Sequence, residues 1–120
     1  KDIRELLKAG AEVNGREPRQ GVTALHLAAH KGHVEAARLL LEGGADMEAV
    51  ELKAGYTALH MAAQAGQAEV VRVLLEAGAV VDATGGGSTA LRLAAQQGHG
   101  AVIGVLAEGG AELTAVGEDG

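Results

Sequence analysis

The sequence predicts an all-α protein, a solenoid of stacked helix-turn-helix units joined by short hairpin loops. Three observations predict this fold class. A seven-residue segment that begins at Thr23 returns at Thr57 and again at Thr89, at offsets of 34 and 32 residues. A glycine after each segment, and a Gly-Ala pair further on, return with the same two offsets. Such self-similarity is the signature of repeat architectures, and 120 residues suffice for one domain with a continuous core.

The first full unit contains signals for two short helices. Thr23 can accept backbone N–H bonds as the N-cap of a helix over residues 24–31. Gly32 can end that helix in the left-handed conformation. A second helix is expected over residues 34–42, with its apolar residues on one stripe. That stripe consists of Ala37, Leu40 and Leu41.

The following units copy this plan. Further helices are expected over residues 58–65, 68–77, 90–97 and 101–108. Residues 2–8 look like the second helix of an earlier unit. We therefore expect a single domain over residues 1–120, divided into a leading half repeat (1–14), three repeats (15–49, 50–83 and 84–115) and the start of a further hairpin (116–120). Arrays of this kind end in polar capping repeats, and neither end of the chain has one, so we expect it to be cut from a longer array.

The repeated segment is Thr-Ala-Leu-His-Leu-Ala-Ala, followed by Gly-His, an apolar run with paired leucines and Gly-Ala-Asp. This pattern resembles the ankyrin repeat, and the resemblance covers essentially the whole chain. It implies that hairpin tips and first helices line a concave face and that second helices form a convex back. It also implies that His26 and His60 tie their repeats to neighbouring loops. The chain departs from the family in having alanine where proline usually follows the threonine, and Arg92 where a third histidine is expected.

Composition restricts the partners. The formal net charge of −6 argues against nucleic acid, which needs clustered Lys and Arg. No apolar run approaches the length of a membrane span, so we expect no membrane insertion. Residues 1–53 hold eight basic and nine acidic side chains, and residues 54–120 hold two and seven, so the second half favours cationic partners. The absence of cysteine excludes disulfides and fits a cytoplasmic or nuclear location.

No group of residues predicts catalysis, and we expect no enzyme activity, cofactor or small-molecule substrate. His26 and His30 have the spacing of a zinc-binding pair, but no third ligand is evident. Residues 85–90 match G-x-G-x-x-A without the strand and long helix that dinucleotide binding requires. The carboxylates fall at helix ends and in loops, where solvated surface charge is expected.

The family resemblance nominates the residues that face a partner. They stand before each repeat threonine and at the end of each first helix, and Tyr56 among them is the only aromatic residue of the chain. Aromatic residues are enriched among interface hot spots. The predicted partner-binding residues are Arg19, Gln20, Val22, His30, Lys31, Lys53, Tyr56, Gln64, Ala65, Ser88, Gln96 and Gln97.

The leading hypothesis is a non-catalytic module, monomeric by itself, that binds a protein or peptide partner on its concave face. One alternative is a structural spacer or regulatory array within a larger enzyme or channel chain. Another is an engineered ankyrin binder. The unequal repeat offsets, and two glycines within the last predicted helical segment (Gly100 and Gly104), count against an engineered origin.

Overall fold

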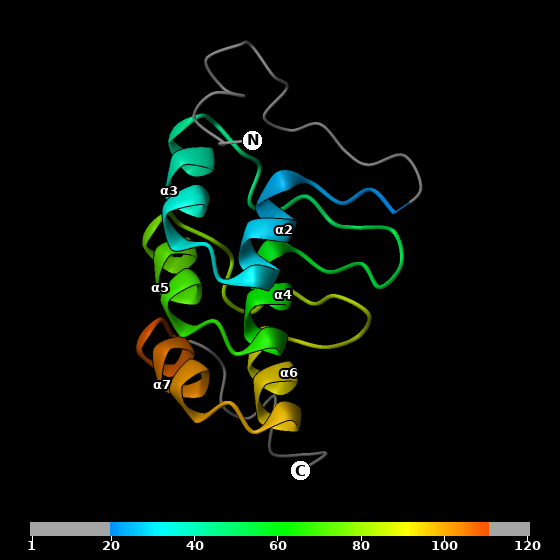
Figure 1. Ribbon diagram of the computed structural model, residues 1–120. Helices are drawn as coiled ribbons and strands as arrows, with labels where there is room; N and C mark the ends of the chain where they lie inside the picture. Colours follow the sequence, from blue (N-terminus) through cyan, green and yellow to red (C-terminus); the bar gives the residue numbers. More distant parts are fainter. Residues whose placement is uncertain (1–19, 111–120) are drawn as a thin grey trace.

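The computed structural model describes residues 20–110, which form six helices in three successive pairs (Figure 1). The first helices of the pairs are α2 (Ala24–Lys31), α4 (Ala58–Ala65) and α6 (Ala90–Gln97). The second helices are α3 (Val34–Glu42), α5 (Ala68–Glu76) and α7 (Gly100–Glu108). The described part contains no strand beyond an isolated bridge between Gly85 and Ser88, so the all-α prediction is confirmed.

The predicted helix bounds differ from the observed ones at two ends. α5 ends at Glu76, one residue earlier than expected, and α7 begins at Gly100, one residue earlier than expected. The helix predicted for residues 2–8 and the hairpin predicted for residues 116–120 lie outside the described residues. No observation of the structure tests the repeat boundaries, which stay a prediction.

The helices stack in two columns. α2, α4 and α6 pack on one another in order, and α3, α5 and α7 pack in a second column beside them. Hairpin loops connect successive pairs and project on the side of the first helices (Figure 1). One face of the described part is therefore formed by hairpins and first helices, and we call it the concave face. The opposite face, formed by the second helices, is the convex back.

Each first helix begins at a threonine cap. The side-chain oxygens of Thr23, Thr57 and Thr89 accept the backbone N–H of the residue three positions later. In the first two pairs that residue is a histidine, whose Nδ1 accepts the threonine N–H in return at 3.1 Å. This reciprocal arrangement satisfies two amides that a helix N-terminus leaves without partners. Arg92 at the third cap keeps the backbone half of the arrangement, at 3.2 Å from the Thr89 hydroxyl.

Glycines end the helices as the sequence predicts. Gly32 and Gly66 close α2 and α4 with φ of 75° and 79°, a conformation that penalises any Cβ. After α3, Gly44 has φ of 95° and the Ala45 N–H donates to the Leu40 carbonyl at 2.9 Å. This is the six-to-one bond of a Schellman motif. These stops let the chain reverse within a few residues, which keeps the units short.

The core is built from small aliphatic side chains. Alanines at the centre of each first helix are fully buried, and because alanine ends at Cβ, neighbouring helices can approach closely. Leucines and valines of the second helices fill the space between the columns. The largest fully buried aliphatic side chains are Leu25, Leu40, Leu74, Leu91, Leu106, Val70, Val71 and Val102. The predicted stripe of α3 is also observed, with Ala37 and Leu40 buried and Leu41 packed against the core.

Candidate functional site

In each of the first two helix pairs, a buried histidine links the pair to the hairpin that follows. His26 Nε2 donates to the Tyr56 carbonyl at 2.9 Å, and His60 Nε2 lies 2.9 Å from the Ala83 carbonyl. Because Nδ1 of each ring accepts a threonine amide, the proton is assigned to Nε2 and the imidazole is neutral. Burial lowers the pKa of His60, and this effect outweighs the opposite influence of its carbonyl acceptors. Both histidines therefore have the tying role that the family resemblance implies.

The hairpin before α4 is organised by a buried carboxylate, Glu51, which is 6% exposed. Its oxygens accept the backbone N–H groups of Lys53, Ala54 and Tyr56 at 2.9, 2.8 and 3.0 Å. Burial acts to raise the pKa of Glu51, but these three N–H groups outweigh it and hold the pKa below 4.5. The expectation that the loop carboxylates are solvated is therefore wrong for Glu51. A hairpin that exposes several amides needs an acceptor, and a glutamate at its start supplies one.

The Tyr56 side chain lies between its own hairpin and the next one. Its ring stacks on the His60 imidazole with centroids 5.4 Å apart and planes at 16°. A Cβ added to Gly85 would come within 3.1 Å of the tyrosine ring and 2.6 Å of the Gly55 carbonyl oxygen, so the next hairpin passes close by. Tyr56 is half-buried and has a packing role in addition to any contact with a partner.

A groove of about 300 Å³ opens on the concave face. One wall is the chain that leads into α2, another is the hairpin of residues 51–56, and the floor is the middle and the end of α4. The Leu52 N–H donates to the Gln20 carbonyl and joins the two walls. Five of the twelve nominated residues line this groove, and three further residues complete it. The lining residues are Gln20, Val22, Glu51, Lys53, Ala54, Tyr56, Met61 and Gln64.

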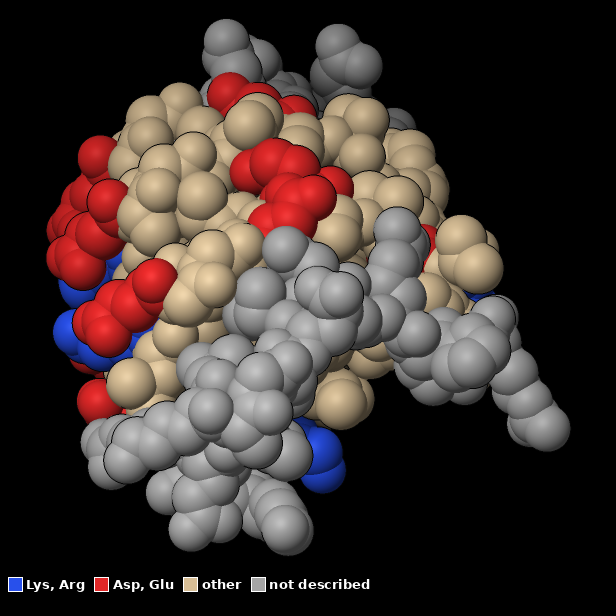
Figure 2. Space-filling model, turned by 90° about the horizontal axis from the view of Figure 1, so that it is seen from above, with Lys and Arg blue, Asp and Glu red and all other residues tan. Residues whose placement is uncertain are grey.

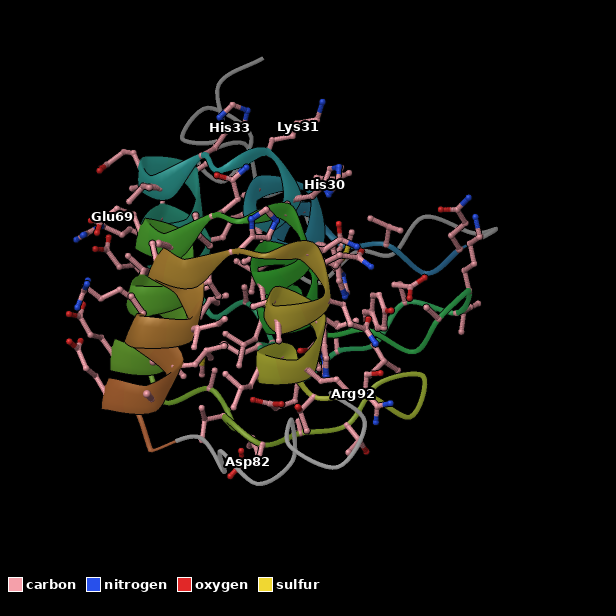
Figure 3. The ribbon with its side chains drawn as sticks, turned by 90° about the horizontal axis from the view of Figure 1, so that it is seen from below. His30, Lys31, His33, Glu69, Asp82 and Arg92 are labelled. Atoms are coloured by element: carbon pink, nitrogen blue, oxygen red, sulfur yellow. The ribbon has the colours of Figure 1, made fainter. Side chains whose placement is uncertain are left out.

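The remaining nominated residues do not line the groove. His30 and Lys31 are exposed at the end of α2, on the outer turn that Figure 3 labels, and Ala65 ends α4. Ser88 forms the bridge with Gly85 in the next hairpin. Gln96 and Gln97 are exposed at the end of α6. Arg19 lies outside the described residues.

Met61 was missed at the sequence level although a signal for it exists. It precedes Gln64 by three residues on α4, so the two share one helix face. Met61 lies inside the repeated seven-residue segment, whereas the nominated positions stand before the threonine of that segment or at the end of the helix. In the structure it is half-buried and lines the groove.

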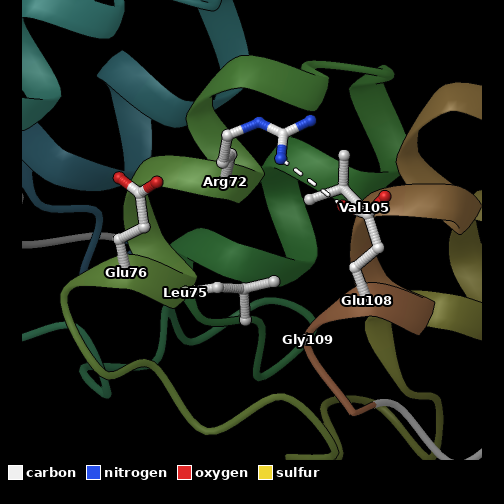
Figure 4. Close-up of a pocket in the computed structure, with 6 residues that line it drawn as sticks. All are labelled: Arg72, Leu75, Glu76, Val105, Glu108 and Gly109. Carbon is white, nitrogen blue, oxygen red and sulfur yellow. Dashed lines mark hydrogen bonds and ion pairs between the residues drawn. The ribbon is translucent and has the colours of Figure 1, made fainter.

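The convex back carries shallower grooves between consecutive second helices. One of about 250 Å³ lies between α5 and α7, where Leu75 and Val105 form its apolar surface (Figure 4). An exposed ion pair spans it, with Arg72 Nη1 3.5 Å from Glu108 Oε1. A groove of the same size recurs between α3 and α5, so the feature follows from helix stacking.

Charged side chains are distributed unequally between the two helix columns. The sequences of α2, α4 and α6 contain no Asp or Glu, and their Lys and Arg residues are Lys31 and Arg92. The second helices carry Glu35, Glu42, Glu69, Glu76, Glu108, Arg38 and Arg72. Acidic and basic side chains lie close together along that edge of the molecule (left in Figure 2). Figure 3 shows Glu69 on the same side, away from the hairpins.

Within residues 20–110, no group of three or more His, Cys, Asp or Glu side chains is placed to hold a metal ion. None of the helices described here has the length and apolar character needed to cross a membrane.

The stacked helix pairs and projecting hairpins define a helical-repeat solenoid. A family model for ankyrin repeats in three copies matches residues 48–116, and a model for a single ankyrin repeat matches residues 20–51. The chain therefore belongs to the ankyrin-repeat family. Proteins of this family are generally protein-protein interaction modules and are typically non-catalytic. A sequence comparison with curated proteins found no match.

Proposed function

We propose that this chain is a non-catalytic protein-interaction module that binds a protein or peptide partner in the groove of its concave face. The observation that carries the proposal is the groove itself. Segments of two successive repeats form its walls, and it combines half-buried apolar side chains with exposed polar ones. Ligand sites have this combination, because apolar surface provides affinity and a few polar groups fix orientation.

The proposed partner class, monomeric state and location rest on charge, exposed apolar surface and composition. The formal charge of −6 opposes binding to a phosphate backbone. Among residues 20–110, the exposed large apolar residues are single side chains in loops or on α2 and do not form a broad apolar face, which supports a monomeric state by itself. Because no cysteine is available for disulfides, we place the protein in the cytoplasm or nucleus. Light scattering after size-exclusion chromatography checks the monomeric state.

A capture experiment tests the proposed function. The immobilised protein is incubated with cell lysate, and bound proteins are identified by mass spectrometry for the wild type and two groove variants, Gln64→Arg and Lys53→Glu. Arg38→Glu on the convex back is the matched control, since it changes the net charge as Lys53→Glu does. Circular dichroism verifies that every variant keeps its helices.

The proposal predicts a partner that the wild type and Arg38→Glu retain and both groove variants lose. A partner that all four proteins retain would place the site outside the groove. If no protein is specifically retained, the interaction role is contradicted and a spacer role within a larger chain is favoured.

A further inference from the structure

We propose that the groove takes a short acidic segment of the partner, with one large apolar side chain in the groove and carboxylates against Lys53 and Lys31. The proposal rests on the proposed function and adds the chemistry of the segment that is recognised. Four features of the concave face support it: the apolar floor, the apolar surface beside it, the two lysines, and the absence of carboxylates on the first helices.

The apolar part of the site is suited to one side chain. Val22, Tyr56 and Met61 are half-buried around a volume of about 300 Å³, at the lower end of the range for ligand pockets. Leu27 on α2 occupies the position that Met61 occupies on α4 and is 51% exposed. Apolar surface therefore continues from the groove onto α2. A large aliphatic or aromatic side chain would bury this surface and remove it from water.

The charged part of the site is basic. Lys53 and Glu51 are the charged residues that line the groove, and Glu51 is buried with its oxygens engaged by three backbone N–H groups. Lys53 is exposed, and Lys31 stands one helical turn beyond Leu27 on α2. Neither lysine has an ion pair with a described residue. The two lysines thus place positive charge beside the apolar surface, and the oxygens of Glu51, the carboxylate among the lining residues, already accept three hydrogen bonds.

The charge distribution on the helices favours the same partner. The first helices carry no carboxylate in their described sequences, whereas five glutamates lie on the second helices. A basic segment would meet Lys53 in the groove and Lys31 on α2. The carboxylates that could attract it lie on the second helices and, as Asp46, Glu48 and Asp82, in the loops that follow α3 and α5. An acidic segment is attracted to the groove and repelled from the convex back, which gives orientation as well as affinity.

A phage-displayed library of random peptides tests this inference. Selection against the immobilised protein is followed by synthesis of enriched sequences, which are titrated by fluorescence anisotropy. Lys53→Glu and Lys31→Glu are compared with the control Arg38→Glu, which makes the same change in net charge on the convex back. Two separate lysine variants are used in case one reversal perturbs the hairpin, and thermal melts verify folding.

We expect enriched peptides with Asp or Glu on either side of a large apolar residue. Reversal of either lysine is expected to weaken binding about tenfold, because an attraction becomes a repulsion at close range. Arg38→Glu is expected to change the dissociation constant less than about twofold. Raising the salt concentration from about 50 mM to about 500 mM should weaken binding of the selected peptides.

Different results separate this inference from the proposed function. Enriched peptides that are neutral or basic would overturn the acidic specificity. If the groove variant Gln64→Arg abolishes their binding, the groove remains the binding site. Peptides unaffected by Gln64→Arg and by both lysine reversals would overturn both statements. Failure to enrich any peptide would overturn recognition of a short segment, while the lysate experiment still decides whether a folded partner binds.

Discussion

Replacement of Glu51 by glutamine isolates the role of the buried carboxylate in forming the groove. The substitution preserves shape and keeps one oxygen acceptor for the N–H groups of Ala54 and Tyr56. The second oxygen becomes an NH₂ group that faces the Lys53 N–H, so one bond is lost and two donors oppose each other. The two remaining bonds lose their charge assistance, which roughly halves their strength.

The structure gives the expected size of this effect. A hydrogen bond to a charged group contributes about 1.5–3 kcal/mol, and the loop position of the hairpin favours the low end of this range. Loss of one such bond and halving of two others should lower the free energy of unfolding by about 3 kcal/mol. For a domain of this size, that corresponds to a melting temperature lower by about 12 °C.

Two spectroscopic signals make the assay specific. Tyr56 is the only aromatic residue, so its fluorescence reports on the hairpin, while circular dichroism reports on the helices. Glu51→Gln should broaden the urea transition seen by tyrosine fluorescence, or move its midpoint to lower urea, more than it changes the transition seen by circular dichroism. The control Glu42→Gln, at the exposed end of α3, should change stability by less than about 0.5 kcal/mol.

The pH dependence provides an independent check on Glu51. Because its pKa in the folded state lies below 4.5, its contribution to stability is fully present above that pH and is lost as the pH falls through the folded pKa. The difference between wild type and Glu51→Gln should therefore shrink in acid. Equal stability of the two proteins at neutral pH would refute the role assigned to Glu51.

Three further predictions concern the repeat framework. Burial lowers the pKa of His60 below 6.5, so the unfolded state binds more protons than the folded state at pH values between the folded and the unfolded pKa. The free energy of unfolding should therefore fall on acidification from pH 7, by at most about 1.4 kcal/mol per pH unit. Urea titrations at several pH values check this, and a wild-type slope equal to that of His60→Gln would contradict it. Gly66→Ala should cost about 2–3 kcal/mol, since its Cβ would lie 2.8 Å from the His99 ring, whereas Gly98→Ala should cost about 1 kcal/mol because the same backbone strain meets no described atom within 4 Å. Equal melting temperatures for those two variants would show that the ring contact is unimportant. Gly104→Ala in α7 should raise stability by about 0.5–1 kcal/mol, because its Cβ meets no atom of the described residues within 4 Å, and a lower melting temperature would contradict this.

The fold could be predicted from the sequence because its signals are local and repeated. Thr23, Gly32 and their counterparts in the later units mark helix ends by cap chemistry that needs no tertiary information. The predicted and observed bounds differ by one residue at the end of α5 and at the start of α7. At the first no glycine stands at the C-cap, and at the second no side chain caps the helix. Gly100, a poor helix former, is nevertheless the first residue of α7, because a first position requires little of the side chain.

The candidate site could be predicted only in part. Family position nominated Gln20, Lys53 and Gln64, which the structure brings together in one groove. The role of Glu51 depends on how the hairpin backbone folds back on itself, and a residue pattern does not show this. The packing of Tyr56 depends in the same way on the path of the next hairpin past its ring.

Site-specific photocrosslinking tests the central claim, that the concave groove is the partner-binding site, most directly. Benzoylphenylalanine is placed at Gln64 in the groove or at Arg38 on the convex back, and each protein is irradiated with the partner from the capture experiment. Both positions are exposed, so an unspecific reagent would label from either one. The account predicts a covalent adduct from position 64 and none from position 38. An adduct from position 38 alone would contradict it and transfer the binding site to the second helices.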